Sequence, residues 1–169
     1  MSRIVMKFGG TSVGSVDRIN HVSSIVKSEF DLGNQVVVVL SAMAGETDKL
    51  INLTKDLSDN FLASEYDVVI SSGEQVSAGA LSGLLNSQGV KAQSRLGWQI
   101  PIVTSGDHKS SRIEAIHSKE LINLLESNVV VIIPGFQGIN SEGRITTLGR
   151  GGSDTCLLYT SDAADDTPC

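Results

Sequence analysis

Four short apolar stretches, separated by segments with helical periodicity, constrain the fold of this chain more than any other feature. They lie at residues 4–8, 36–40, 100–104 (the weakest of the four) and 129–133. Continuous apolar runs of this length are typical of strands buried on both faces, as in parallel sheets covered by helices. The sequence therefore predicts an α/β fold: a three-layer sandwich with a mostly parallel central sheet.

The intervening segments predict four helices, each with an apolar stripe at helical spacing. The stripes consist of Ile19, Val22, Val26 and Phe30, followed by a stop at Gly33-Asn34; Leu50, Leu53 and Leu57 in a helix at 48–57; Val76, Ala80 and Leu84 in a helix at 74–88; and Leu121, Leu124 and Leu125 in a helix at 118–126 capped at Ser118. Residues 67–70 fit either a strand or the start of a helix.

The composition is typical of one globular domain, and it argues against nucleic acid and membranes as partners. The chain has 169 residues with a formal net charge of −6, which argues against a nucleic-acid surface built on bulk positive charge. The longest apolar run, residues 36–40, is far shorter than the ~20 residues of a membrane span, and no signal-peptide pattern follows Met1. We expect a cytosolic protein with no membrane partner.

The last fourteen residues, 156–169, differ in composition from the rest. They hold both cysteines, three acids and no basic residue, so without them the net charge would be −3. The segment resembles translated sequencing-adapter read-through, and we expect a non-native or disordered tail; an ordinary acidic terminus is the alternative. The spacing of Cys156 and Cys169 matches no zinc or redox motif.

Four turns that follow strands combine glycine with polar or charged side chains. They are Lys7-Phe8-Gly9-Gly10-Thr11-Ser12, the segment 41–48, Pro134-Gly135-Phe136-Gln137-Gly138 and, after a short hairpin, Gly149-Arg150-Gly151-Gly152-Ser153-Asp154. Ligands of open α/β sheets bind at the carboxyl ends of strands, and glycine lets backbone N–H groups approach a phosphate closely. With Lys7 and Arg150 as cations, these turns indicate an anion site, although a Gly-Gly pair alone is compatible with a simple tight turn. The P-loop and G-x-G-x-x-G fingerprints are both absent, which argues against P-loop enzymes and Rossmann dehydrogenases.

Five segments in register resemble the successive motifs of the aspartate kinases, within the amino acid kinase family. They are Lys7-Phe8-Gly9-Gly10-Thr11-Ser12, Val39-Leu40-Ser41-Ala42-Met43, Ser72-Gly73-Glu74, Gly135-Phe136-Gln137-Gly138 and Thr147-Leu148-Gly149-Arg150-Gly151-Gly152-Ser153-Asp154-Thr155. The resemblance covers residues 1–155 and implies the N-terminal, amino-acid-binding part of an amino acid kinase domain. It breaks off where the family continues into a nucleotide-binding half and regulatory domains, so no feedback effector can be read from this sequence.

The resemblance implies phosphorylation of the L-aspartate side chain by ATP with Mg²⁺ as cosubstrate, the first step toward lysine, threonine and methionine. A carboxylate with a pKa of about 3.9 is ionised at neutral pH, so no general base is needed. The implied catalytic residues are Lys7 and Asp154; the implied phosphate contacts are Lys7, Phe8, Gly9, Gly10 and Ser12; and the implied substrate contacts are Ser41, Thr47, Glu74, Arg150, Gly151, Gly152, Ser153 and Asp154. In these roles Lys7 neutralises the transferred phosphoryl group, Glu74 binds the substrate ammonium, Arg150 binds a carboxylate, and Asp154 orients the catalytic lysines. No protein-bound metal is expected.

Simpler structural interpretations stay open for the same residues. Lys7 also fits a solvated lysine at a strand end, Thr47 and Glu74 fit the first turns of helices, and Asp154 fits an N-cap. His21, His108 and His117 lack metal-like spacing, and Trp98 fits a packing residue.

Two other functions remain possible: another kinase of the family, of the acetylglutamate or uridylate kinase kind, and a non-catalytic amino-acid-binding module. We expect the full-length enzyme to be a homo-oligomer, residues 1–169 alone to be inactive, and Lys7, Ser41, Glu74, Arg150 and Asp154 to meet at the carboxyl edge of the sheet.

Overall fold

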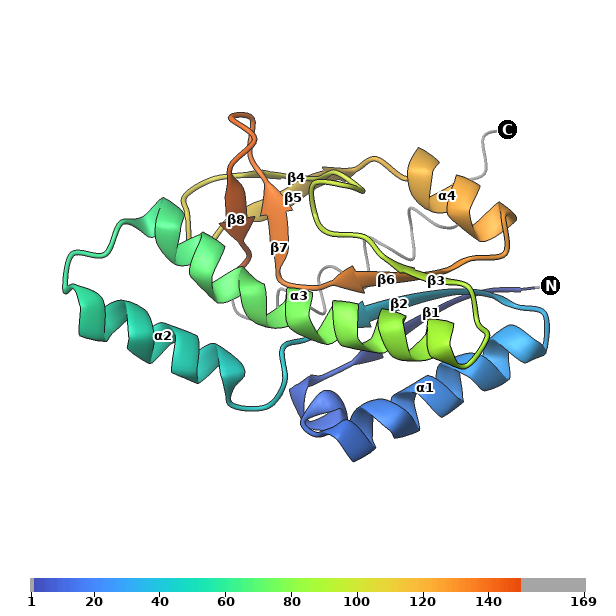
Figure 1. Cartoon of the computed structure of the whole chain (residues 1–169). Helices are drawn as coiled ribbons and strands as arrows, with labels where there is room; N and C mark the ends of the chain where they lie inside the picture. The colour runs from blue at the N-terminus through green and yellow to red at the C-terminus, as the bar shows by residue number, and fades with distance from the viewer. Residues whose placement is uncertain (1, 150–169) are drawn as a thin grey trace.

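A computed structural model describes residues 2–149 of the chain (Figure 1). In chain order its elements are β1 (Arg3–Phe8), the 3₁₀ helix η1 (Gly10–Val13), α1 (Val16–Asp31), β2 (Gln35–Leu40), α2 (Glu46–Leu57), α3 (Ala63–Ser87), β3 (Ala92–Ser94), β4 (Ile102–Ser105), β5 (Arg112–Ile116), α4 (Lys119–Glu126), β6 (Val130–Pro134), β7 (Gln137–Ile139) and β8 (Ile145–Thr147). The expectations for residues 150–169 lie outside this range.

The central sheet has four parallel strands in the order β1-β2-β6-β3. Lys7 pairs with Val39, and Leu40 pairs with Pro134, so the carboxyl ends of β1, β2 and β6 meet at one edge. Their apolar side chains form one buried cluster on each face of the sheet. The predicted α/β fold with a mostly parallel central sheet is therefore confirmed.

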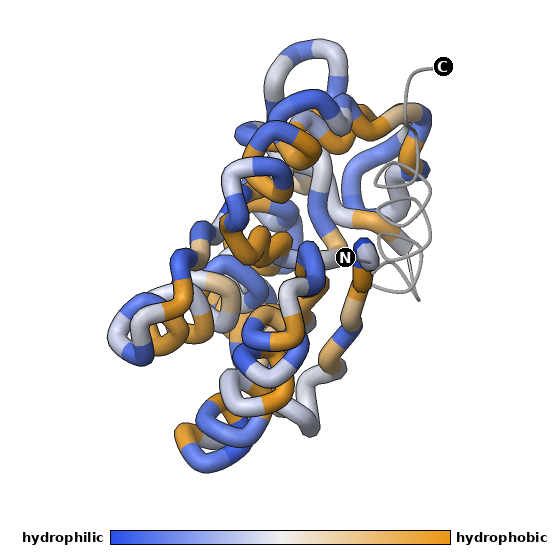
Figure 2. The backbone as a smooth tube through the Cα atoms, turned by 90° about the vertical axis from the view of Figure 1, so that its right-hand side faces the viewer, coloured by the Kyte–Doolittle hydropathy of each residue, from blue (hydrophilic) through white to orange (hydrophobic). Residues whose placement is uncertain are grey.

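Helices α1 and α3 cover one face of this sheet, while α4 and a second sheet cover the other (Figure 1). Local signals delimit α1: the Ser15 side chain accepts from the Arg18 amide at 3.2 Å, and Gly33 takes φ +82° just after the helix. This left-handed turn favours glycine because it has no Cβ. Hydrophilic and hydrophobic residues alternate along the helices in Figure 2, as in helices that bury one side.

The expectation for residues 100–104 needs correction. The strand forms two residues later, as β4, and belongs to a second four-stranded sheet with the order β5-β4-β7-β8. This sheet is mixed, since β4 runs antiparallel to β5 and parallel to β7. The place beside β6 is taken by the three-residue strand β3, which is too short to produce an apolar run in the sequence.

The third helix also differs from its prediction. It begins at Ala63 instead of residue 74, so residues 67–70 are helical and Glu74 lies in the middle of α3, not in a first turn. Of the expected inward stripe only Leu84 packs against the core: Val76 is 63% exposed and Ala80 is exposed, and the buried side includes Gly73 and Glu74. At Gly73 only a residue without a side chain fits, because a Cβ would lie 2.9 Å from the Ala42 Cβ, whereas Ile70 and Leu81 are buried on the same side of the helix.

Two smaller expectations also fail. Leu53 and Leu57 of α2 are exposed, because α2 lies at the periphery and packs mainly on α3 (Figure 1). Ser118 precedes α4 but makes no capping hydrogen bond through its side chain.

Candidate active site

The loops that follow three central strands are joined to one another at the carboxyl edge of the sheet. The Ser41 amide donates to the Phe8 carbonyl at 3.1 Å, and the Ala44 amide donates to the Gly10 carbonyl at 3.1 Å. The Gly135 amide donates to the Leu40 carbonyl at 2.8 Å. Three of the glycine-bearing segments singled out in the sequence thus form one structural unit.

Two glycines, one in the turn after β1 and one in the middle of α3, allow close packing around Ala42. A Cβ on Gly10 would lie 2.8 Å from the Ala42 carbonyl oxygen, and a Cβ on Gly73 would lie 2.9 Å from the Ala42 Cβ. Neither distance is compatible with a side chain unless the backbone moves. The loop around Ala42 is therefore held between the turn after β1 and the helix that carries Glu74.

Glu74 is the most unusual titratable group at this edge. Its side chain is only 4% exposed, and Oε2 is buried with no hydrogen-bond partner among residues 2–149. Burial raises the pKa of the Glu74 carboxyl to about 7, although hydrogen bonds from its own amide and from the Ala42 amide act in the opposite direction. A buried carboxylate with an unused oxygen is suited to a positively charged ligand group, because pairing would compensate its lost hydration.

Lys7 and Glu74 reach the edge from different elements. Side chains alternate along β1, so Lys7 shares the face of Val5, which packs with the α4 cluster, whereas Glu74 comes from α3 on the other face. The meeting of all five expected residues in one cleft stays a prediction, since Arg150 and Asp154 lie outside the described residues.

The remaining sequence-predicted positions follow the same edge. Phe8 ends β1, Gly9 precedes η1, and Ser12 lies within it, with its amide donating to the Gly9 carbonyl at 2.9 Å. Ser41 directly follows β2, and Thr47 is the second residue of α2. Gly151, Gly152 and Ser153 fall beyond residue 149, the last residue described.

A buried polar cluster that the sequence reasoning missed lies two helical turns before Glu74. Asp67 is fully buried and bonds to His108, to the Lys109 amide and to the Thr147 hydroxyl. The available signal was the spacing of polar residues at 67, 71 and 74, which places them on one side of a helix. The contact with Asp67 gives His108 a structural role that its position in the sequence did not indicate.

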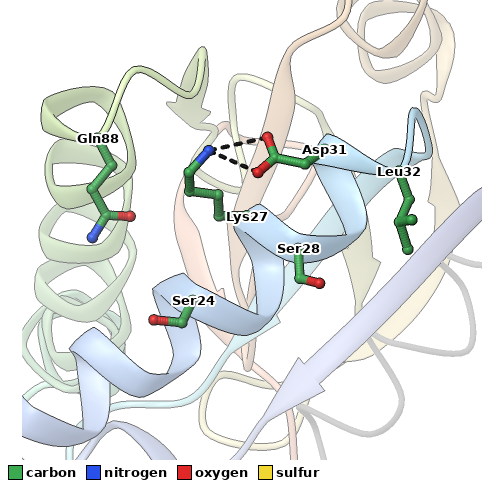
Figure 3. A pocket seen from close by; sticks show the side chains of 6 residues that line it. All are labelled: Ser24, Lys27, Ser28, Asp31, Leu32 and Gln88. Carbon is green, nitrogen blue, oxygen red and sulfur yellow. Dashed lines mark hydrogen bonds and ion pairs between the residues drawn. The ribbon is translucent and has the colours of Figure 1, made fainter.

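A groove away from this edge lies between α1 and the end of α3 (Figure 3). It has a volume of about 590 Å³ and is lined by Ser24, Lys27, Ser28, Asp31, Leu32 and Gln88. Lys27 and Asp31 pair across one helical turn at 2.8 Å. None of the expected site residues lines this groove.

Within residues 2–149, no cluster of three or more His, Cys, Asp or Glu side chains is placed to hold a metal ion. None of the described helices combines the length and the apolar character needed to cross a membrane.

A family model and a curated relative match most or all of this chain. The family model "Amino acid kinase family" matches residues 2–164. An aspartokinase from Rickettsia felis is 49% identical over 100% of this chain, which spans 43% of that relative's length.

Solved structures give the same neighbours. An aspartate kinase from Synechocystis superposes with a TM-score of 0.78 at 44% identity, covering 93% of this chain and 26% of that one. E. coli aspartokinase III in complex with aspartate and ADP superposes with a TM-score of 0.84 at 25% identity, covering 94% of this chain and 46% of that one.

Proposed function

The chain belongs to the amino acid kinase family, and we propose that the full protein transfers the γ-phosphoryl group of ATP to the side-chain carboxylate of L-aspartate. The similarity to an aspartokinase along the whole chain supports this activity, and so does a superposable structure that holds aspartate and ADP. The chain spans less than half of the curated relative, so the proposal concerns the full-length enzyme.

Glu74 is the observation that carries the choice of substrate. Its carboxylate is buried beside Ala42, and Oε2 has no partner among the described residues. The ammonium group of a free amino acid supplies both the charge and the N–H donors that such a carboxylate lacks. N-acetylglutamate has a neutral amide in this place and uridylate has no amine, so neither would compensate the buried charge.

The other proposed roles follow from the chemistry of phosphoryl transfer. An oxygen of the ionised aspartate side chain attacks the γ-phosphorus, and the bond to the bridging oxygen of ADP breaks, with the electron pair leaving on ADP. No proton has to move, so catalysis consists of positioning and charge stabilisation. Lys7 would neutralise the transferred group, with Phe8, Gly9, Gly10 and Ser12 forming the adjoining backbone and hydroxyl contacts.

The remaining substrate contacts are proposed on the family pattern. Ser41 and Thr47, at the start of the neighbouring loop and helix, would line the amino-acid site together with Glu74. Arg150 would hold a substrate carboxylate through its planar fork of donors, and Asp154 would orient the catalytic lysines. Mg²⁺ would enter with ATP as part of the cosubstrate.

A full-length chimaera tests the proposal: residues 1–155 of this chain followed by the remaining part of the R. felis aspartokinase. Coupled ADP-release assays with MgATP would compare aspartate, N-acetylglutamate, glutamate and uridylate as acceptors. We expect turnover with aspartate only, and none from residues 1–169 alone. Preference for N-acetylglutamate or uridylate, or binding of aspartate without turnover, would contradict the proposal.

A further inference from the structure

Asp67 forms a completely buried carboxylate that is held by donors from two distant parts of the chain. The Thr147 hydroxyl donates to Oδ1 at 2.6 Å, and Nδ1 of His108 lies 2.6 Å from Oδ2. The Lys109 amide donates to both oxygens, at 3.1 and 3.2 Å. Every donor lies more than forty residues away in the sequence, so this carboxylate joins elements that have no local connection.

The elements joined in this way are α3, the turn at 106–111 and the end of β8. Lys109 takes φ +70°, a strained conformation for a residue with a side chain. The hydrogen bond from its backbone N–H to Asp67 helps to stabilise this conformation. The same turn also hydrogen-bonds directly to β8, because the Ser111 amide donates to the Thr147 carbonyl at 3.0 Å. Thr147 is therefore fixed through its side chain by α3 and through its backbone by the turn.

The position of Thr147 gives this arrangement a consequence for the substrate site. Thr147 is the last residue of β8 and lies three residues before Arg150 in the chain. Asp67 and Glu74 are seven residues apart on the buried side of α3, a separation of about 10 Å along the helix axis. One rigid helix thus carries Glu74 directly and, through Asp67, holds the strand that leads to Arg150.

We propose that Asp67 is a positioning residue: by bonding to Thr147 it fixes the end of β8 on α3, the helix that carries Glu74. This inference rests on the proposed function, in which Glu74 binds the ammonium of one amino acid and Arg150, three residues after Thr147 in the chain, binds its carboxylate. An amino acid presents these two groups at a fixed spacing, so a shift of either partner weakens binding of the whole molecule. Asp67 does not itself touch the substrate.

The neighbouring threonine provides a matched control. Thr146 is as buried as Thr147, but its hydroxyl bonds to the Thr104 hydroxyl at 2.6 Å and not to Asp67. Thr146→Val and Thr147→Val each remove one buried hydroxyl from the same short strand. Only the second change releases β8 from α3, so any effect shared by both variants is a general effect of losing a buried hydrogen bond.

The first measurement uses the 169-residue chain and follows hydrogen exchange at single amides. The Leu148 amide donates to the Phe136 carbonyl and the Ser111 amide to the Thr147 carbonyl, so both report on the end of β8. We expect Thr147→Val to accelerate exchange at both amides about tenfold, the factor expected for loss of one hydrogen bond to a charged group. Thr146→Val should do so far less, and Thr147→Ser, which keeps the hydroxyl, should restore protection.

The second measurement uses the full-length chimaera and steady-state kinetics. We expect Thr147→Val to raise the KM for aspartate about tenfold with little change in kcat or in the KM for ATP, because the variant weakens substrate alignment and not the phosphoryl contacts. Thr147→Ser and Thr146→Val should stay close to the unmodified enzyme. Asp67→Asn replaces one acceptor oxygen by an NH2 donor that the surrounding donors cannot pair with. This variant should therefore also raise the KM for aspartate.

The outcomes separate this inference from the proposed function. If the unmodified chimaera phosphorylates aspartate but Thr147→Val changes the KM for aspartate no more than Thr146→Val, the positioning role is refuted and the proposed function stands. Equal hydrogen exchange in the two valine variants would refute it as well. An unmodified, folded chimaera that does not phosphorylate aspartate would overturn both.

Discussion

The substitution Glu74→Gln is expected to stabilise the folded chain at neutral and alkaline pH while it removes the charge of the proposed contact with the substrate ammonium. Burial raises the pKa of Glu74 from its ordinary 4.5 to about 7, so the folded chain binds this proton more tightly than the unfolded chain does. Stability contributed by the protonated form is therefore lost as the pH rises from 4.5 toward 7. Each pKa unit corresponds to about 1.4 kcal/mol, so at pH 8 the ionised carboxylate costs the folded state about 3 kcal/mol.

Glutamine has the same shape and can still accept from the Ala42 amide, but it carries no charge. We expect Glu74→Gln to raise the free energy of unfolding by about 3 kcal/mol at pH 8 and by only about 1 kcal/mol at pH 5.5. Urea unfolding of the 169-residue chain at the two pH values measures both differences. The matched control is Glu114→Gln, an exposed glutamate on β5, which should change stability by less than about 0.5 kcal/mol.

Two results would refute this reasoning. One is a Glu74→Gln variant that is no more stable than the parent at pH 8. The other is a gain that is equal at pH 5.5 and pH 8, since a constant difference would not come from ionisation of a buried carboxyl. Either result would also weaken the argument that Glu74 awaits a cationic partner.

Three further predictions concern the same edge of the sheet. In the full-length chimaera, aspartate affinity measured by calorimetry should fall about tenfold from pH 8 to pH 6 as Glu74 gains its proton, and a flat profile would contradict the ammonium contact. Gly73→Ala should destabilise the chain by about 1–3 kcal/mol in thermal unfolding because its Cβ would lie 2.9 Å from the Ala42 Cβ. Gly79→Ala, on the same helix with open space around it, should be neutral or stabilising by up to about 1 kcal/mol; equal effects at the two sites would rule out the close approach. Lys7→Ala should lower kcat, at most slightly changing the KM for aspartate, and an effect on that KM alone would reassign Lys7 to the amino acid.

Local sequence was sufficient for the parts of the molecule whose conformation depends on near neighbours. The apolar runs of β2 and β6 predicted a parallel sheet because side chains buried on both faces leave no room for polar alternation. The half-buried strand β1 pairs with β2 at the edge of that sheet. Ser15 and Gly33 delimit α1 through contacts within one or two turns. Parallel connections then place the loops after these strands at a common edge, which is why the glycine-bearing segments could be expected to lie together.

Burial and long-range partners were decided only by the tertiary structure. The inward side of α3 carries Asp67 and Glu74 among buried apolar residues and leaves Val76 exposed. A periodicity of apolar residues cannot reveal this, since it assumes that the buried side is the most hydrophobic one.

The raised pKa of Glu74 and the bond between Asp67 and Thr147 have the same origin. The first arises from desolvation by elements that meet only after folding, and the second joins residues eighty positions apart. Hydropathy and spacing describe what each segment can do alone, whereas the electrostatics of a buried group depend on which segments enclose it.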